Sequence, residues 1–242
     1  MIFPIGDDNV KGGHYPLLSY SFIALNILVF LYELSLNATP GALNQFIFDF
    51  GALPYEIVNG QDLHTLFTSM FLHGGWMHLI GNMLFLWVFA DNIEATIGST
   101  RFFLFYFLGG MAAHACHIFF DPGSEIPTVG ASGAISAVLG AYLVMFPRSR
   151  VKVLVVFFVF KVPAILFLGL WIGQQWMAGS AALTVPTAES AGVAYWAHIG
   201  GFVFGFLAGF YYRAKFTMPA LENQRVSPDR PRPTYPKNDE FV

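Results

Sequence analysis

Residues 130–145 read GASGAISAVLGAYLVM, an unbroken stretch of small and apolar residues that contains one serine near its start, Ser132. Gly133, Ser136 and Gly140 recur at three- and four-residue spacing, so in a helix they form one stripe that lets a second helix approach closely. A serine flanked by small residues is more often a packing position than a reactive group. The role of Ser132 therefore depends on the polar residues that the other apolar segments carry.

The composition predicts a membrane protein. The chain has 242 residues, of which 55% are hydrophobic and 11% charged, and this excludes an ordinary soluble domain. A helix needs roughly 20 apolar residues to cross a bilayer, whereas membrane-barrel strands alternate in polarity and are about half as long. We therefore expect an all-α bundle of six transmembrane helices, at about residues 16–37, 76–97, 102–121, 130–147, 162–180 and 193–213.

The basic residues predict the orientation of these helices. With a cytoplasmic N-terminus, all 12 Lys and Arg fall on one side, and the segments on the other side contain acids only. Positive charge stays on the cytoplasmic side, so we expect both termini in the cytoplasm of a multi-pass protein in a prokaryotic inner membrane. Residues 1–15 lack a signal peptide and form a short polar N-terminus, and the proline-rich residues 214–242 form a disordered cytoplasmic tail.

Two segments between the helices are apolar but do not span. Residues 42–75 follow the first expected helix and are interrupted by Gly51, Pro54 and Gly60. We expect them to form short amphipathic helices, an interfacial insertion on the outer side between the first two spanning helices. Residues 148–161 are expected to form an apolar cytoplasmic loop.

The second expected helix carries the most informative polar pattern. His78 and Asn82 are four residues apart, so both project from one face near the outer end, just after His73. A structural alternative is that Asn82 bonds across a helix pair and His78 lies at the interface. A zinc site is disfavoured, because two histidines five apart without a His-Glu-x-x-His arrangement lack metalloprotease geometry. No metal or other cofactor is expected.

The sixth expected helix complements the stretch around Ser132. His198 is followed on the same face by Gly201, Gly205 and Gly209, a second stripe of small residues. If the two stripes pack together, His198 approaches Ser132 at a similar depth. His114 and His117 in the third helix are interpreted as hydrogen-bonding residues that face the bundle, and Glu33 as an interfacial carboxylate that reaches water.

These residues supply the parts that acyl transfer needs: a nucleophile, a base within about 3 Å, and donors for the developing oxyanion. Ser132 would attack and His198 would accept its proton. His78 and Asn82 would stabilise the oxyanion together with the backbone N–H of Ser132. The result is a dyad, unless Glu33 contributes as a third member.

With these motifs the sequence resembles the rhomboid family of intramembrane serine proteases over residues 16–213. The matches are Gly-x-Ser-Gly at 130–133, His-x-x-x-Asn at 78–82 and His-x-x-Gly-x-x-x-Gly at 198–205. The resemblance implies an endopeptidase that cuts transmembrane protein substrates in the bilayer near the outer face, without nucleic acid, metal or cofactor. Two positions differ from the family: His64-Thr65 stands where many members have a Trp-Arg pair in the insertion, and Ser136 stands where some have a tyrosine that packs on the catalytic histidine.

The sequence disfavours three alternatives to a protease. A non-catalytic rhomboid-like factor that binds and escorts membrane proteins would be expected to lack Ser132 or His198, and both are present. A small transporter would show inverted repeats and broken helices, and the sequence shows no internal repeat. An α/β-hydrolase would need a glycine where Ala134 stands, preceded by strands.

Overall fold

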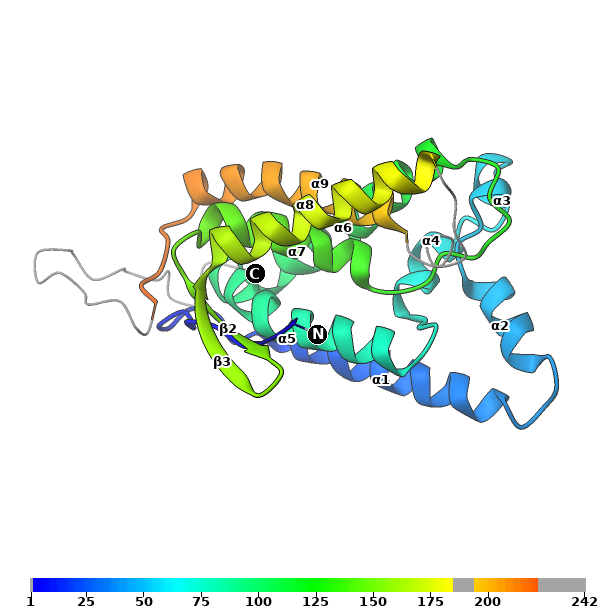
Figure 1. Cartoon of the computed structure of the whole chain (residues 1–242), viewed down its shortest axis with the longest axis horizontal. Coiled ribbons are helices and arrows are strands. Elements are labelled where there is room, and N and C mark those ends of the chain that lie inside the picture. Colours follow the sequence, from blue (N-terminus) through cyan, green and yellow to red (C-terminus); the bar gives the residue numbers. More distant parts are fainter. Residues whose placement is uncertain (1, 185–193, 222–242) are drawn as a thin grey trace, which may run out of the picture.

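A computed structural model describes residues 2–184 and 194–221 of the chain. Within these residues, long helices that lie roughly along one axis carry the fold (Figure 1). They begin and end within a few residues of the six predicted helices: α1 (Leu17–Leu36), α5 (Trp76–Ile97), α6 (Ser99–Phe120), α7 (Ser132–Met145), α8 (Ala164–Thr184) and α9 (Tyr195–Lys215).

Not all of these helices are equally apolar. Among the described residues, α1 and α6 are long and apolar enough by length and composition to cross a membrane, and α7 is a shorter apolar helix. Helix α5 contains the buried polar residues Asn82, Asn92 and Glu94, which make it less apolar overall. Because these side chains form hydrogen bonds inside the bundle, they do not prevent a membrane location, but the count of six spans stays a prediction.

Helix α7 lies in the core, and α9 packs directly along it. Most residues of α7 from Ala134 to Met145 are buried. A methyl group added to Gly201 would collide with the carbonyl oxygen of Gly133, and one added to Gly205 with that of Ala137. The two helices therefore approach to backbone contact, and the predicted pairing of the two stripes of small residues is confirmed.

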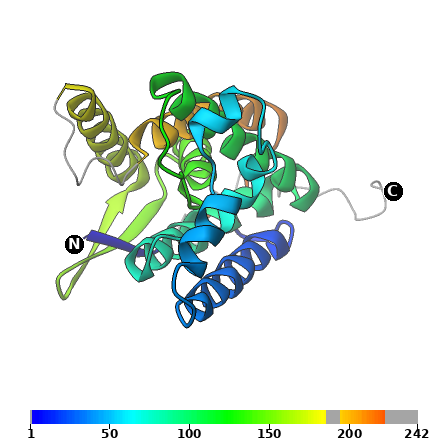
Figure 2. The same cartoon turned by 90° about the vertical axis from the view of Figure 1, so that its right-hand side faces the viewer.

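The segment between α1 and α5 forms short helices at one end of the bundle, which Figure 2 shows end-on. They are α2 (Ala42–Phe50), α3 (Pro54–Val58), α4 (Thr65–Thr68) and a 3-10 turn, η1 (Ser69–Phe71). The insertion is joined to the loop before α7 by the backbone pair Ala52 and Thr128, and by a 2.9 Å bond from the Gly130 N–H to the Ser69 carbonyl. This segment therefore fixes the chain just before Ser132.

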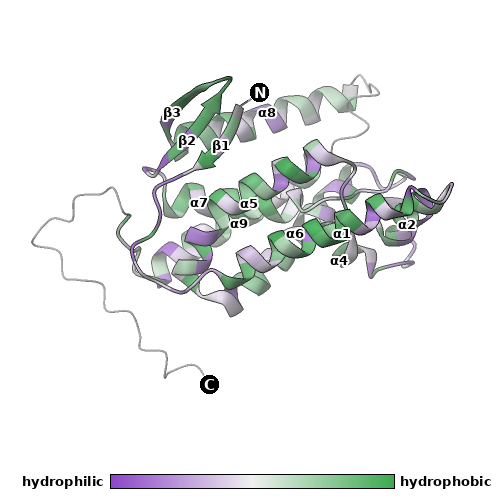
Figure 3. Cartoon of the chain, turned by 90° about the horizontal axis from the view of Figure 1, so that it is seen from below, coloured by the Kyte–Doolittle hydropathy of each residue, from purple (hydrophilic) through white to green (hydrophobic). Residues whose placement is uncertain are grey.

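A three-stranded antiparallel sheet lies at the opposite end of the bundle and corrects the all-α prediction. Its strands are β1 (Ile2–Gly6), β2 (Arg150–Val155) and β3 (Phe158–Pro163), in the order β1-β2-β3. The expected loop at 148–161 is thus a hairpin, because valines alternate along it and Val151 and Val153 are buried. Figure 3 shows this apolar hairpin beside α8.

The expected polar N-terminus and disordered tail are partly structured. Val10 pairs with Leu221, which is buried, and the Lys11 N–H bonds the Ala220 carbonyl at 2.8 Å. Helix α9 continues to Lys215, so the tail does not begin at 214 as predicted. Residues 222–242 of that prediction lie outside the described residues.

A buried polar cluster joins the N-terminal segment to the bundle. The Asp7 carboxylate accepts hydrogen bonds from the Tyr142 hydroxyl on α7 and from Asn92 on α5, the latter at 2.7 Å. Burial raises the pKa of Asp7 to about 7, although the bonds from Tyr142 and Asn92 act in the opposite direction. Nearby, Glu94 accepts the Leu18 and Ser19 N–H groups and caps the start of α1.

Candidate active site

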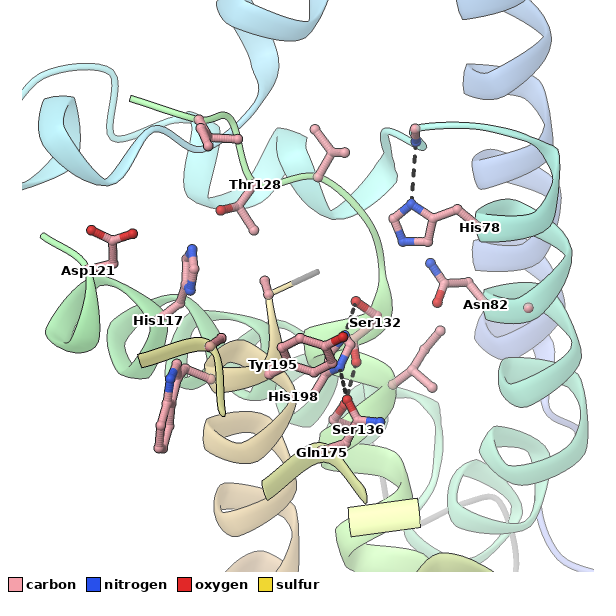
Figure 4. A pocket seen from close by; sticks show the side chains of 18 of the residues that line it. His78, Asn82, His117, Asp121, Thr128, Ser132, Ser136, Gln175, Tyr195 and His198 are labelled. Atoms are coloured by element: carbon pink, nitrogen blue, oxygen red, sulfur yellow. Dashed lines mark hydrogen bonds between the residues drawn. The ribbon is translucent and has the colours of Figure 1, made fainter. Parts of the chain in front are cut away.

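The structure brings Ser132 and His198 together. Ser132 is the first residue of α7, and His198 lies in the first turn of α9. The Ser132 Oγ lies 2.8 Å from His198 Nε2 (Figure 4). This is the distance at which an imidazole can accept a hydroxyl proton, so the predicted nucleophile and base have suitable geometry.

The other ring nitrogen of His198 contacts a residue that the sequence reasoning did not single out. Gln175 on α8 is buried, and its Oε1 lies 2.8 Å from His198 Nδ1. One turn earlier on α8, the Trp171 ring lies 5.9 Å from the His198 ring, centroid to centroid, at 38°. These two contacts position His198. Some rhomboid proteins use a tyrosine for this purpose, and this chain has Ser136 at that place. Instead, the Ser136 hydroxyl bonds the Ser132 carbonyl at 2.6 Å.

His78 and Asn82 face the turn that precedes Ser132. The Gly74 N–H donates to His78 Nδ1 at 3.4 Å, which leaves His78 Nε2 as the nitrogen that carries a hydrogen. A methyl group added to Gly130 would lie 2.6 Å from His78 Nε2 and 3.4 Å from Asn82 Nδ2. Gly130 has a φ of 119°, so a glycine is required here both by the backbone and by the approach of the two side chains.

A chain of contacts behind Asn82 holds it in place. Asn82 Nδ2 lies 3.0 Å from His73 Nε2, and the His73 N–H donates to both carboxylate oxygens of Glu33, at 3.1 and 3.3 Å. The interpretation of Glu33 as a water-reaching carboxylate is wrong, because its side chain is only 2% exposed and bonds the insertion to α1. Because Glu33 bonds the backbone of His73, we assign it a structural role, and not that of a third catalytic group beside Ser132 and His198.

All four predicted site residues line one cavity of about 980 Å³. Its wall also includes Gln175 and Trp171 from α8 and His117 from α6. His117 Nδ1 is buried and has no hydrogen-bond partner among the described residues. His114 lies outside the cavity wall and pairs with Ser69 at 3.1 Å, as expected of a residue that bonds within the bundle.

The arrangement can support acyl transfer chemically. The first N–H groups of a helix have no acceptor within that helix and carry a partial positive charge, so the start of α7 favours a developing anion beside Ser132. His78 Nε2 and Asn82 Nδ2 approach the same turn from α5. The cavity therefore combines a nucleophile, a base and hydrogen-bond donors on rigid helices.

Comparison with known proteins identifies relatives. The Rhomboid domain family matches residues 60–215. The chain is 28% identical over 217 residues to Rhomboid protein 1, mitochondrial, of Saccharomyces cerevisiae. The aligned region covers 88% of this chain and 56% of that protein. The chain is 32% identical over 194 residues to Rhomboid protease GluP of Bacillus subtilis, covering 80% of this chain and 34% of GluP. The chain thus spans about half the length of the first relative and a third of the second.

Proposed function

Because the chain belongs to the rhomboid family, whose members are embedded in membranes, we propose that it is an intramembrane serine endopeptidase. Its substrates are other membrane proteins, cut in or near their transmembrane segments. The observation that carries the proposal is the 2.8 Å contact between Ser132 Oγ and His198 Nε2 at the wall of a large cavity. No metal or cofactor takes part in the proposed reaction.

In the proposed mechanism, Ser132 Oγ attacks the carbonyl carbon of the scissile peptide bond while His198 Nε2 accepts its proton. The carbonyl oxygen becomes an oxyanion, which accepts hydrogen bonds from His78 Nε2–H, from Asn82 and from the Ser132 backbone N–H. His198 then gives its proton to the leaving amine as the C–N bond breaks. A water molecule, deprotonated by His198, hydrolyses the resulting ester and regenerates the Ser132 hydroxyl.

The principal alternative is a non-catalytic rhomboid-like protein that binds and escorts membrane proteins. Such a protein has no need of a serine and an imidazole at hydrogen-bond distance. The bond between Ser132 and His198, and the glycine at 130 that admits His78 and Asn82, therefore favour an enzyme.

Cleavage by purified protein tests the function. Wild type should cut a transmembrane substrate that carries small and helix-breaking residues near its outer end. Replacing Ser132 or His198 by Ala should abolish cleavage, and the double variant should lose little more than either single one, because the two groups act as a unit. A fluorophosphonate should label Ser132 in wild type only. Ser21→Ala is the matched control, because the Ser21 hydroxyl bonds Leu17 on the exposed side of α1. Cleavage by Ser132→Ala would refute the proposal.

We further propose six spans, with both termini on one side and the insertion on the other. The relatives include a mitochondrial and a bacterial protein. The proposed location is therefore either a mitochondrial membrane or the predicted prokaryotic inner membrane. Single cysteines at Gln61 and Arg148, both exposed, on a Cys116→Ser background test the orientation with an impermeant thiol reagent in intact bacterial cells. We expect labelling at 61 and protection at 148; the reverse pattern would overturn the topology.

A further inference from the structure

We infer that Gln175 is a positioning residue that holds His198 in the one tautomer able to activate Ser132. This inference rests on the proposed function and deepens it. Gln175 lies on α8, whereas Ser132 and His198 lie on α7 and α9. The reacting pair therefore depends on a third helix that carries neither reacting group.

The hydrogen-bond geometry carries the argument. Neutral imidazole has one N–H and one acceptor nitrogen, and a base needs the acceptor facing its proton donor. His198 Nε2 faces Ser132 Oγ, and His198 Nδ1 faces Gln175 Oε1, both at 2.8 Å. An amide oxygen can only accept, so this arrangement fixes the hydrogen on Nδ1 and leaves Nε2 free to take the serine proton.

The orientation of the Gln175 amide decides which nitrogen of His198 carries the hydrogen. If the amide were rotated, Gln175 would present N–H to Nδ1, and His198 would place its hydrogen on Nε2. Ser132 would then face an N–H and could not be deprotonated. A carboxylate at this position would also fix the tautomer, but burying its charge would carry a large desolvation cost that the neutral amide avoids. Trp171 adds a ring contact from the same helix face, one turn away.

The test compares two adjacent glutamines. Gln175→Leu removes the acceptor at similar volume, and Gln174→Leu makes the same change at an exposed neighbour. We expect Gln175→Leu to lower kcat by roughly 10- to 100-fold, the effect of a hydrogen bond to a group that becomes charged, with KM nearly unchanged. Gln174→Leu should match wild type. Gln175→Glu should restore part of the turnover lost in Gln175→Leu, because a carboxyl oxygen can also accept the Nδ1 hydrogen.

A second readout does not depend on cleavage. In Ser132→Ala protein with ¹⁵N-labelled histidine, the His198 signal should report a hydrogen on Nδ1, and Gln175→Leu should produce a mixture of tautomers. Equal kcat in the two leucine variants, or an unchanged tautomer, would overturn the inference. If wild type itself neither cleaves nor reacts with a fluorophosphonate, the proposed function fails instead.

A separate observation concerns the tip of the β2–β3 hairpin. Its side chains are apolar and largely uncovered: Phe157 is 89% exposed, Phe158 70% and Val156 66%. We propose that this tip inserts into the lipid head-group and upper acyl region of the leaflet on the side of the sheet. Figure 3 shows the hairpin projecting from the bundle beside α8.

Two features favour lipid as the occupant. The apolar surface is continuous with the outside of α8, because β3 runs directly into that helix, where Ile165, Leu166 and Leu170 are exposed. The middle of the hairpin is basic, because Lys152 and Lys161 lie opposite each other in register. Like charges in that position repel, so a phosphate head group complements them.

The test places a nitroxide label at Phe157→Cys in a Cys116→Ser protein in liposomes that contain anionic phospholipid. The label should be protected from an aqueous paramagnetic reagent and should report a depth of roughly 5–10 Å below the phosphates. A label at Gln61→Cys, an exposed polar position in the insertion, provides the water-accessible control. Full aqueous access at 157 would overturn the proposal, and so would dipolar coupling between labels of two copies, which would assign the tip to self-association.

Discussion

Replacing Gly130 by alanine should uncouple the oxyanion donors from Ser132. The added methyl group would lie 2.6 Å from His78 Nε2 and 2.7 Å from Cε1 of the same ring, distances that real contacts do not reach. His78 is tethered by the Gly74 N–H, so the ring must break that bond or the turn before α7 must shift. Either movement separates the donors from the oxyanion.

The size of the effect has two parts. Losing one oxyanion donor costs roughly 100- to 1000-fold in kcat, about 2.7–4 kcal/mol. Forcing a side chain onto a backbone with a φ of 119° adds strain of about 1–3 kcal/mol, which appears in stability. We therefore expect kcat to fall at least about 100-fold, with KM little changed and the melting temperature lowered by a few degrees.

Alanine variants of two other glycines separate the effect on kcat from the effect on stability. Gly60 also has a positive φ, 75°, but a methyl group there meets nothing within 4 Å, so Gly60→Ala should lose stability only. Gly123 lies in the same loop as Gly130 and has open space, so Gly123→Ala should behave as wild type. Steady-state cleavage and thermal melts on the three variants decide the matter. Wild-type kcat in Gly130→Ala, or an equal loss in Gly60→Ala, would refute the reasoning.

Further expectations concern the other parts of the site and its scaffold. Asn82→Ala and His78→Ala should each lower kcat by roughly 100- to 1000-fold at constant KM; a lower melting temperature with intact turnover would make both residues structural. Gly205→Ala should destabilise the protein by about 1–3 kcal/mol, because its methyl group meets the Ala137 carbonyl, whereas Gly173→Ala on α8 has open space and should be neutral in thermal melts. Since Asp7 has a pKa of about 7 in the fold and near 4 when unfolded, its contribution is complete below pH 4 and is lost as pH rises to 7, up to about 4 kcal/mol. Asp7→Asn should flatten that dependence in melts between pH 4 and 8, and equal slopes would contradict it.

The helices and the reacting pair were predictable because their signals are local and redundant. Long apolar segments specify helices wherever they end up, and two stripes of small residues can satisfy each other in few ways. The stripe that begins at Gly133 and the one that begins at Gly201 meet at backbone distance, and this contact brings the His198 turn next to Ser132. Spacing within each helix was therefore enough to predict a contact between them.

The sheet and Glu33 were not predictable, because each depends on a distant partner. The valines of β2 become a strand against β1, from the far end of the chain, and without that partner the segment resembles a loop. Glu33 is at a helix end where carboxylates usually meet water, and only the folded insertion places the His73 backbone N–H beside it. Gln175 did carry a signal: a polar side chain within an apolar segment is expensive, and is a functional candidate for that reason.

The pairing of β1 with β2 sets an order of events during synthesis. Ile2 pairs with Val155, which is made about 150 residues later. At roughly 5–20 residues per second, the first strand waits on the order of 10 s while α1, α5, α6 and α7 are produced. Asp7, which follows this strand, also needs Asn92 and Tyr142 for its hydrogen bonds. The sheet therefore closes late in synthesis, and a nascent chain that stalls before the hairpin leaves its first strand without the strand it pairs with.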